Sequence, residues 1–437
     1  MCIPSLAERI LRLAGRTIMS PHRMIALALL TAPFFGAAAC ADTKNVADAQ
    51  PTSDAPSTPD APSNTVVTSQ FQLRNAMRVL WRDHVVWTRA YLISAIADLP
   101  DMSTAAERLL RNQADIGNAI KPFYGDAAGD ALTALLRTHI TIAVEIVTAA
   151  KASDSAKLTD AKARWSTNAD EIATFLAGAN PNWALADLKQ MMQMHLAQTL
   201  VEATARLTGD WDGDVKATDE VNAHIISMAD VLTSGIAKQF PQKVSTGTTM
   251  GTASEDLHRS MRVLWEEHVI WTRFYVIGAV AGLPDATASA ERLLRNQKDI
   301  GDALKPLYGD AAGDALTNLL RSHITIAVEI VAAARVSNEA LLADAKVRWS
   351  TNADEIATFL AAANPNWSVT TLKEAMRMHL DQTLVEATAR LKSDWAGDVV
   401  AFDRVREHIL GMADILSDGI VKQFPAKFVG GPATTAH

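Results

Sequence analysis

The chain has 437 residues, enough for two or three ordinary domains with sizeable cores. It carries 41 Lys and Arg against 49 Asp and Glu, which gives a net charge of −8 and a pI near 5.8. This balance argues against nucleic-acid binding and against a polybasic membrane-surface protein, because both need a concentrated basic surface. A mean hydropathy of +0.05 excludes a polytopic membrane protein. Two cysteines cannot build a disulfide framework or a Cys-type zinc site.

Residues 1–39 are typical of a secretory signal peptide, with basic residues before an apolar run over 24–35 and small residues after it. The run is too short to indicate a spanning helix. Cys40 directly follows the small residues, as in a bacterial lipobox, so we expect it to be the lipidated first residue of the mature protein. The alternative is plain secretion after the Ala-x-Ala motif, which leaves Cys40 as a free thiol.

After the expected anchor, residues 40–70 are rich in Pro, Ser, Thr, Asp and Ala and offer little to bury. Such a composition predicts a disordered tether. Together the two segments indicate an exported protein of the bacterial cell envelope, held at a membrane by its lipid anchor and facing the periplasm or the exterior.

The remainder of the chain is one unit written twice. Met77 to Lys243 aligns with Met261 to Lys427 at a constant offset of 184, without a gap, and 117 of the 167 positions are identical. A unit of this length is a domain and not a solenoid repeat. We therefore expect two homologous domains, a Gly/Thr/Ser-rich linker and a flexible tail. Their bounds are 71–244 for the first copy, 256–428 for the second, 245–255 for the linker and 429–437 for the tail.

Apolar residues recur every three and four positions throughout each copy, and Pro and Gly stand at the breaks. This pattern predicts an all-α fold of two tandem helical bundles, each with about four long and two shorter helices, and no strands. In the first copy the expected helices are 71–98, 104–121, 127–151, 155–178, 184–208 and 214–239.

Eight of the eleven histidines form four pairs across the copies, each in the middle of a different long helix and on its apolar stripe. Burying a polar group costs free energy unless it finds a partner. One imidazole per long helix, facing a common axis, therefore predicts a shared polar network or a shared ligand. The pairs are His84/His268, His139/His323, His195/His379 and His224/His408.

Neutral imidazole is the commonest metal ligand, and helical bundles hold metal sites between facing helices. Glu202 and its copy Glu386 lie on the same stripe as His195 and His379, and with the histidines they would suit Zn, Cu or Fe. No Glu-x-x-His occurs, which disfavours a carboxylate-bridged di-iron site. The residues expected to line the ligand are Trp87, Thr88, Asn112, Asn168 and Thr199 with their copies Trp271, Thr272, Asn296, Asn352 and Thr383.

The structural alternative is a core in which these threonines and asparagines, or backbone carbonyls, satisfy the histidines. Arg89 and Arg273 need partners if they are buried, and Asp115 or Asp170 with their copies could supply them. The acids of Asp210-Trp-Asp-Gly-Asp resemble a calcium loop, but the second copy has Ala396 in the middle. We interpret them as caps of the last helix.

Both copies carry the motifs LW..HV.WTR, RLL.NQ.DIG, KP.YG.AAG, NAD.IA.FL and ANP.W. The whole of each copy resembles a widespread family of bacterial proteins, usually single-domain and often secreted, which are labelled "glycosyltransferase" without an established activity. This chain departs from that pattern by its duplication and its expected lipid anchor. The transferase activity is not carried over, because sugar-nucleotide transferases are mostly α/β or membrane-embedded.

Three hypotheses follow. The first is a non-catalytic envelope lipoprotein whose bundles each bind a metal ion or a small ligand through the core histidines. The second is a structural or interaction bundle with a satisfied histidine core. The third is an envelope enzyme in which His195 or His84 acts as general base near Glu202.

Overall fold

The computed structural model of the protein describes residues 68–245 and 253–428. The signal peptide, Cys40, nearly all of the tether, most of the linker and the tail lie outside the described residues. The expectations for those segments therefore remain predictions.

The described residues are almost wholly helical, which confirms the all-α fold. The first copy holds α2 (Gln70–Ile96), α3 (Met102–Tyr124), α4 (Asp126–Lys151), α5 (Ser155–Ala179), α6 (Leu185–Thr208) and α7 (Trp211–Gln239). The second holds α8 (Ala253–Ala281), α9 (Ala286–Tyr308), α10 (Asp310–Arg335), α11 (Glu339–Ala363), α12 (Val369–Leu391) and α13 (Trp395–Gln423), followed by the short α14 (Pro425–Phe428).

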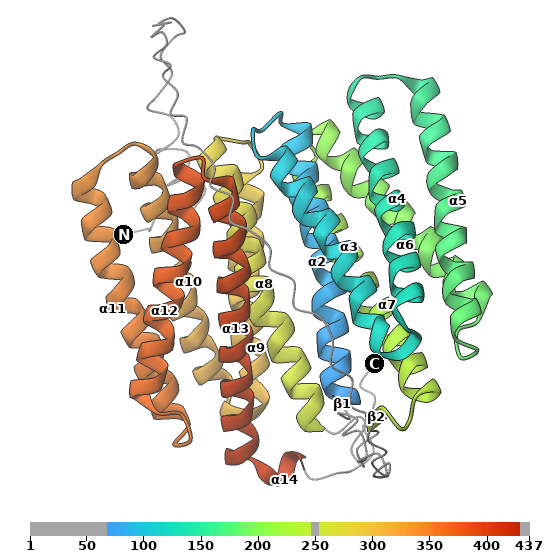
Figure 1. Ribbon diagram of the computed structural model, residues 1–437. Coiled ribbons are helices and arrows are strands. Elements are labelled where there is room, and N and C mark those ends of the chain that lie inside the picture. The colour runs from blue at the N-terminus through green and yellow to red at the C-terminus, as the bar shows by residue number, and fades with distance from the viewer. Residues whose placement is uncertain (1–67, 246–252, 429–437) are drawn as a thin grey trace, which may run out of the picture. The chain divides into compact units, whose positions relative to one another are not determined.

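The six helices of each copy close into a ring. Each helix packs against the helices before and after it in the chain, and the first packs against the last. Because the connections are short, neighbouring helices run antiparallel, as the blue-to-green and yellow-to-red sets in Figure 1 show. The first helix also touches the third and fifth of its own ring. Side chains of α2, α4 and α6 therefore meet inside the first ring.

Helix bounds agree with the sequence prediction to within three residues at every end of the first copy. The largest difference at a C-terminus is in α3, which runs through Pro122 to Tyr124 and ends at Gly125, where φ is +84°. Proline in the last turn removes a single backbone hydrogen bond, whereas the positive φ favours glycine. The helices expected to be shorter, α3 and α5, have 23 and 25 residues against 24 for α6, so all six are of similar length.

Two very short strands, β1 (Thr68–Ser69) and β2 (Val244–Ser245), pair in parallel, although the sequence pattern predicts no strand. A two-residue strand is too short to show a period of two. The pair joins the segment entering α2 to the segment leaving α7.

Asp210 caps the last helix of the first ring, as the sequence predicts: its carboxylate accepts a hydrogen bond from the Gly213 N–H at 3.0 Å. Asp394 does the same in the second ring. Asp214 is different, because it is fully buried and binds the guanidinium groups of Arg89 and Arg206.

The two rings contact each other through α2, α3 and α7 on one side and α8, α9 and α13 on the other. Trp87 lies in this contact, with the guanidinium carbon of Arg273 4.6 Å from its ring centroid and Phe402 edge-on at 5.8 Å. Its copy Trp271 stacks in the same way on Arg89.

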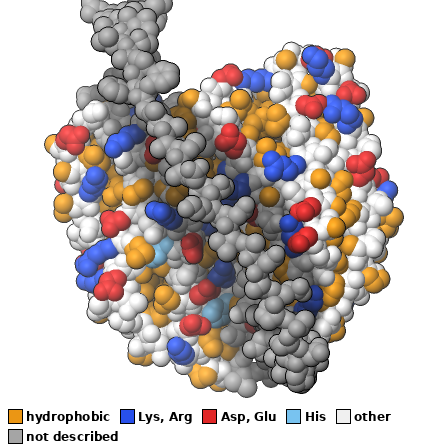
Figure 2. Space-filling view, in the orientation of Figure 1, with side chains coloured by type: hydrophobic (Ala, Val, Ile, Leu, Met, Phe, Trp, Pro, Cys, Tyr) orange, Lys and Arg blue, Asp and Glu red, His pale blue; other side chains and the backbone are white. Residues whose placement is uncertain are grey.

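By length and composition alone, α4 and α10 could cross a membrane. In the structure they are members of the rings, and Leu132, Leu136 and Ile142 of α4 belong to the buried core of the first ring. Lys and Arg intermingle with Asp and Glu over the face shown in Figure 2. That face presents no concentrated basic surface in its described part.

Helices α3 and α4 cross at two glycines. A Cβ on Gly117 would lie 2.5 Å from the carbonyl oxygen of Gly129, and a Cβ on Gly129 would lie 2.6 Å from that of Gly117. These separations leave no room for a methyl group, so the close backbone approach depends on glycine at both positions.

We predict that Gly117→Ala lowers the free energy of unfolding by about 1–3 kcal/mol, because the methyl group overpacks this crossing. The matched control is Gly178→Ala in α5, where a Cβ meets open space and the second copy already has Ala362. The control should be neutral or stabilising by up to about 1 kcal/mol. Urea unfolding followed by circular dichroism measures both, and equal effects would contradict the packing argument.

Candidate functional site

Three of the four predicted histidines of each copy meet at the centre of its ring. In the first ring they are His84 from α2, His139 from α4 and His195 from α6, all less than 4% exposed. Their ring centroids are 5.4 Å apart for His84 and His195, 6.1 Å for His139 and His195, and 6.4 Å for His84 and His139. The apolar stripes of alternate helices thus bring the three imidazoles together, as the sequence predicts.

The same cluster occurs in the second ring. The imidazole centroids are 5.4 Å apart for His268 and His379, 6.1 Å for His323 and His379, and 6.4 Å for His268 and His323.

Asn168 orients the ring of His139. The amide nitrogen of Asn168 donates to the carbonyl of Leu135 at 3.2 Å, so its oxygen is free to accept the Nδ1–H of His139 at 2.9 Å. Neutral His139 therefore carries its proton on Nδ1 and a lone pair on Nε2. Nε2 is buried and has no hydrogen-bond partner in the structure. His323 and Asn352 repeat this arrangement.

In the second copy, a glutamine orients the histidine of the first helix. Gln297 donates to the carbonyl of Leu293 and to Asn296, and its oxygen accepts the Nδ1–H of His268 at 3.2 Å. The His268 imidazole thus turns its unprotonated Nε2 toward the centre of the helical ring. In the first copy, Gln113 makes the same two donations, but its oxygen and the Nδ1 of His84 are buried without a hydrogen bond.

Nε2 of His84 lies 3.3 Å from Nε2 of His195, so one of these nitrogens donates and the other accepts. The other nitrogen of each imidazole, Nδ1 of His84 and Nδ1 of His195, is buried without a hydrogen-bond partner.

Burial keeps these rings neutral. It lowers the pKa of His84 and His268 to about 4, although the neighbouring glutamine side chains act in the opposite direction. Burial and the neighbouring histidine of the first helix lower the pKa of His139 and His323 to about 3. The pKa values of His195 and His379 also lie well below normal, for the same two reasons.

A small cavity of about 40 Å³ adjoins the three histidines of the first ring. Thr88 and Thr199 line it, and their hydroxyls donate to the carbonyls of His84 and His195. The rest of the wall is mainly aliphatic and aromatic, with Trp165 among it. The second ring has a cavity of about 30 Å³ beside Thr272, Thr383 and Trp349. Each volume has room for roughly one to three water molecules.

The fourth histidine of each copy is bonded to a backbone carbonyl and does not line the cavity. His224 donates its Nε2–H to the carbonyl of Met191 at 2.9 Å, and its ring centroid lies 6.4 Å from that of His195. His408 makes the equivalent bond to Ala375. These nitrogens are occupied by backbone and not turned to the cavity.

Glu202 lies apart from the cluster and binds Arg89. Its carboxylate accepts from Arg89 at 3.1 Å and from Thr218 at 2.9 Å, while Asp214 holds the same guanidinium at 2.7–2.8 Å. Burial raises the pKa of Glu202, and raises that of Glu386 to about 7. Arg89 is thus paired with Glu202 and Asp214 and not with the aspartates expected from sequence.

The predicted lining residues divide into four groups. The threonines Thr88, Thr199, Thr272 and Thr383 line the cavities, and Asn168 and Asn352 orient a histidine from behind. Asn112 and Asn296 bind the orienting glutamines and a backbone carbonyl of the first helix. Trp87 and Trp271 lie at the contact between the rings.

Sequence reasoning missed Gln113 and Gln297. Their positions one residue after a stripe asparagine, in the repeated motif RLLRNQ, were the available signal.

Among the described residues, no three His, Cys, Asp or Glu side chains form a ready-made metal site. No protein-family model, no curated protein and no solved structure matches the chain.

The buried histidines predict a pH-dependent stability. Their pKa is lower in the folded than in the unfolded state, where it is near 6.5, so the unfolded state gains protons first as the pH falls. Stability should be complete above about pH 6.5 and fall toward pH 4, by about 1.4 kcal/mol per pH unit for each such histidine. Urea titrations between pH 7 and 5 measure the slope.

His139→Gln removes one of these groups and should flatten the slope by about that amount. An unchanged slope in this variant would contradict a neutral, buried His139.

Proposed function

We propose that each ring binds one transition-metal ion at its centre, through His84, His139 and His195 in the first copy and His268, His323 and His379 in the second. The observation that carries the proposal is the meeting of three buried, neutral imidazoles from alternate helices. This ligand set is smaller than the one expected from sequence, because Glu202, Glu386, His224 and His408 are bonded elsewhere.

Unpartnered nitrogens support the proposal. Nε2 of His139 is buried without a hydrogen bond, as is Nε2 of His323 in the second copy. An unsatisfied buried acceptor costs about 1–3 kcal/mol. A metal ion bound at these nitrogens would remove that cost in both copies.

The geometry of the pair on α2 and α6 also supports it. Two nitrogen ligands of a tetrahedral ion with bonds of about 2.0–2.1 Å lie roughly 3.3–3.4 Å apart. The Nε2 atoms of His84 and His195 are separated by 3.3 Å. His139 lies farther out and has to move inward on binding, which accounts for the lack of a ready-made site among the described residues.

The outer nitrogens of two ligands are already held. Asn168 accepts from Nδ1 of His139, and Gln297 accepts from Nδ1 of His268. Ligating histidines almost always donate their second N–H in this way, which fixes both the tautomer and the ring orientation.

The charge of the site favours copper(I) among the expected metals. Three neutral ligands compensate none of the charge of an ion, and Glu202, the nearest carboxylate on the same stripe of α6, is bonded to Arg89. A buried, uncompensated charge is costly, so a single positive charge is favoured over two. Zinc would need an accompanying hydroxide, and iron sites usually include a carboxylate.

The cavity favours binding over catalysis. Its volume of about 40 Å³ has no room for an organic substrate beside the ion. A His/Glu general base finds no support, because Glu202 is bonded to Arg89 and Thr218.

The structural alternative is favoured by the direct His84–His195 hydrogen bond. In that case one water in the cavity would donate to His139 Nε2 and satisfy the core without a metal. Metal analysis separates the two functions.

Protein expressed in media containing Zn, Cu and Fe, and kept reduced, should carry two metal ions per chain. At free copper(I) of about 100 times the dissociation constant, each site should add about 2.7 kcal/mol to the free energy of unfolding. Elemental analysis and thermal unfolding measure these effects. Protein that takes up none of the three metals and gains no stability would leave the structural core as its function.

The matched variants are His139→Gln with His323→Gln, which should lose the metal, and His224→Gln with His408→Gln, which should retain it. Far-UV circular dichroism checks that both remain helical. Equal loss of metal in the two double variants would contradict the proposed ligand set.

We also propose that the protein is an exported lipoprotein of the cell envelope, anchored through Cys40. Support comes from the sequence of residues 1–70 alone. Cys40→Ala should move the protein from the membrane fraction to the soluble fraction, and mass spectrometry of the wild type should find a diacylated or triacylated N-terminal cysteine. An unmodified Cys40 would indicate plain secretion.

A further inference from the structure

Two kinds of ion pair between the rings occur twice, with the copies exchanged. Adding 184 to the residue of the first copy and subtracting 184 from that of the second converts one pair into the other. Arg206 binds Asp285 and Arg390 binds Asp101, while Arg108 binds Asp403 and Arg292 binds Asp219. The two copies are thus related here by an approximate twofold exchange.

At the centre of the contact, residue 82 of the first copy faces the equivalent residue of the second copy, residue 266. Arg82 Nη1 lies 2.7 Å from Glu266 Oε2, and position 266 is position 82 of the second copy. Arg82 is 1% exposed and Glu266 is 4% exposed. In a contact between two identical rings, this position would bury arginine against arginine or glutamate against glutamate.

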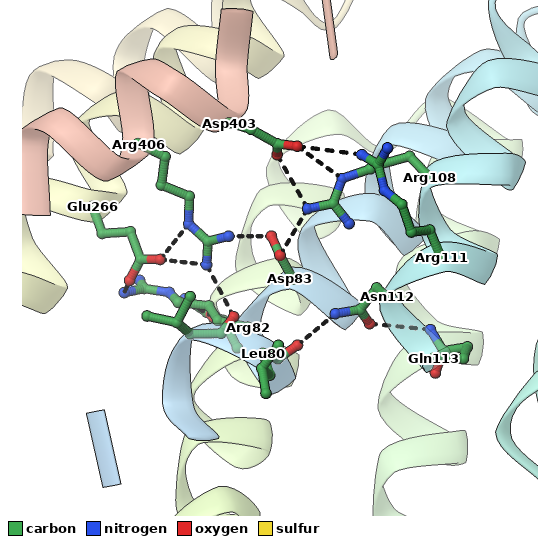
Figure 3. A network of polar contacts seen from close by, with 12 residues as sticks. Leu80, Arg82, Asp83, Arg108, Arg111, Asn112, Gln113, Glu266, Asp403 and Arg406 are labelled. Atoms are coloured by element: carbon green, nitrogen blue, oxygen red, sulfur yellow. Dashed lines mark hydrogen bonds and ion pairs between the residues drawn. The ribbon is translucent and has the colours of Figure 1, made fainter. Parts of the chain in front are cut away.

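A second difference between the copies completes the pairing. Arg406 stands where the first copy has Asn222, and its Nε donates to Glu266 at 2.6 Å. The same guanidinium also bridges to Asp83 (Figure 3). On the other side, Asn222 accepts from Nε of Arg82 at 3.1 Å. The first ring therefore offers Arg82 and Asp83, and the second offers Glu266 and Arg406.

Burial makes these differences decisive. Like charges placed together at an interface cost several kcal/mol, and a buried charge that loses its partner is strongly destabilising. The mixed contact gives Arg82 two carboxylates, Glu266 and Glu267, and gives Glu266 two arginines, Arg82 and Arg406.

We infer that the first ring recognises the second ring in preference to another copy of itself, and that positions 82/266 and 222/406 determine this choice. The surface around Arg82 therefore binds a helical face that carries the opposite charge at the equivalent position. The second copy of the same chain supplies that face. The inference rests on the ion pairs between the rings and does not depend on metal binding.

The test uses the full chain with a protease recognition sequence placed within residues 246–252. After cleavage, native mass spectrometry and size-exclusion chromatography over a dilution series measure the dissociation constant of the two halves. Wild-type halves should remain a one-to-one complex.

The double variant Glu266→Arg with Arg406→Asn makes the second ring carry the residues of the first. Its halves should separate with a dissociation constant raised by about 100-fold or more. Adding Arg82→Glu with Asn222→Arg exchanges the two sets and should restore most of the affinity. Circular dichroism follows helicity in every variant.

The control is Arg164→Glu on α5, an exposed arginine that pairs with Glu145 and Asp160 of its own copy. It should leave the affinity unchanged. Wild-type affinity in the double variant would overturn the inference. The inference would also be overturned if the variant with all four substitutions recovered neither helicity nor affinity, because charge complementarity would then not be the cause.

Discussion

The burial of neutral imidazoles at the centre of each ring is the constraint on which the site depends. Burial removes the charged form of each histidine. Each neutral imidazole then has one N–H, which needs an acceptor, and one nitrogen with a lone pair. Asn168 and Gln297 accept those protons from behind, on helices that do not carry the histidines. Nε2 of His139 is left beside the small cavity without a hydrogen bond. The metal ion that we propose would bind at that nitrogen, with the imidazole already oriented by Asn168.

Buried charged groups are kept out of that centre and lie near the contact between the rings. Helix α6 shows the division: His195 and Thr199 face the cavity, whereas Glu202, two turns farther along, binds Arg89. Arg89 in turn stacks on Trp271 of the other copy. One apolar stripe thus passes from the neutral histidine cluster to a network of buried ion pairs.

The sequence was sufficient for the helices and for the three histidines, because a period of 3.6 residues and the Pro and Gly breaks determine which faces turn inward. It was not sufficient for the partners. Glu202 shares a stripe with His195, but the stripe does not show that Arg89 competes for it. Gln297 orients His268 from a neighbouring helix, a contact that no local pattern contains. The contact between the copies left a signal in the opposite charges at positions 82 and 266, which can be interpreted only once the copies are known to meet there.

X-ray absorption at the copper edge of protein loaded with copper(I) tests the histidine centre most directly. We predict three imidazole nitrogens at about 2.0 Å with no sulfur neighbour, and loss of that shell in His139→Gln with His323→Gln. Copper that shows oxygen or sulfur neighbours, or that keeps its imidazole shell in the double variant, would contradict it.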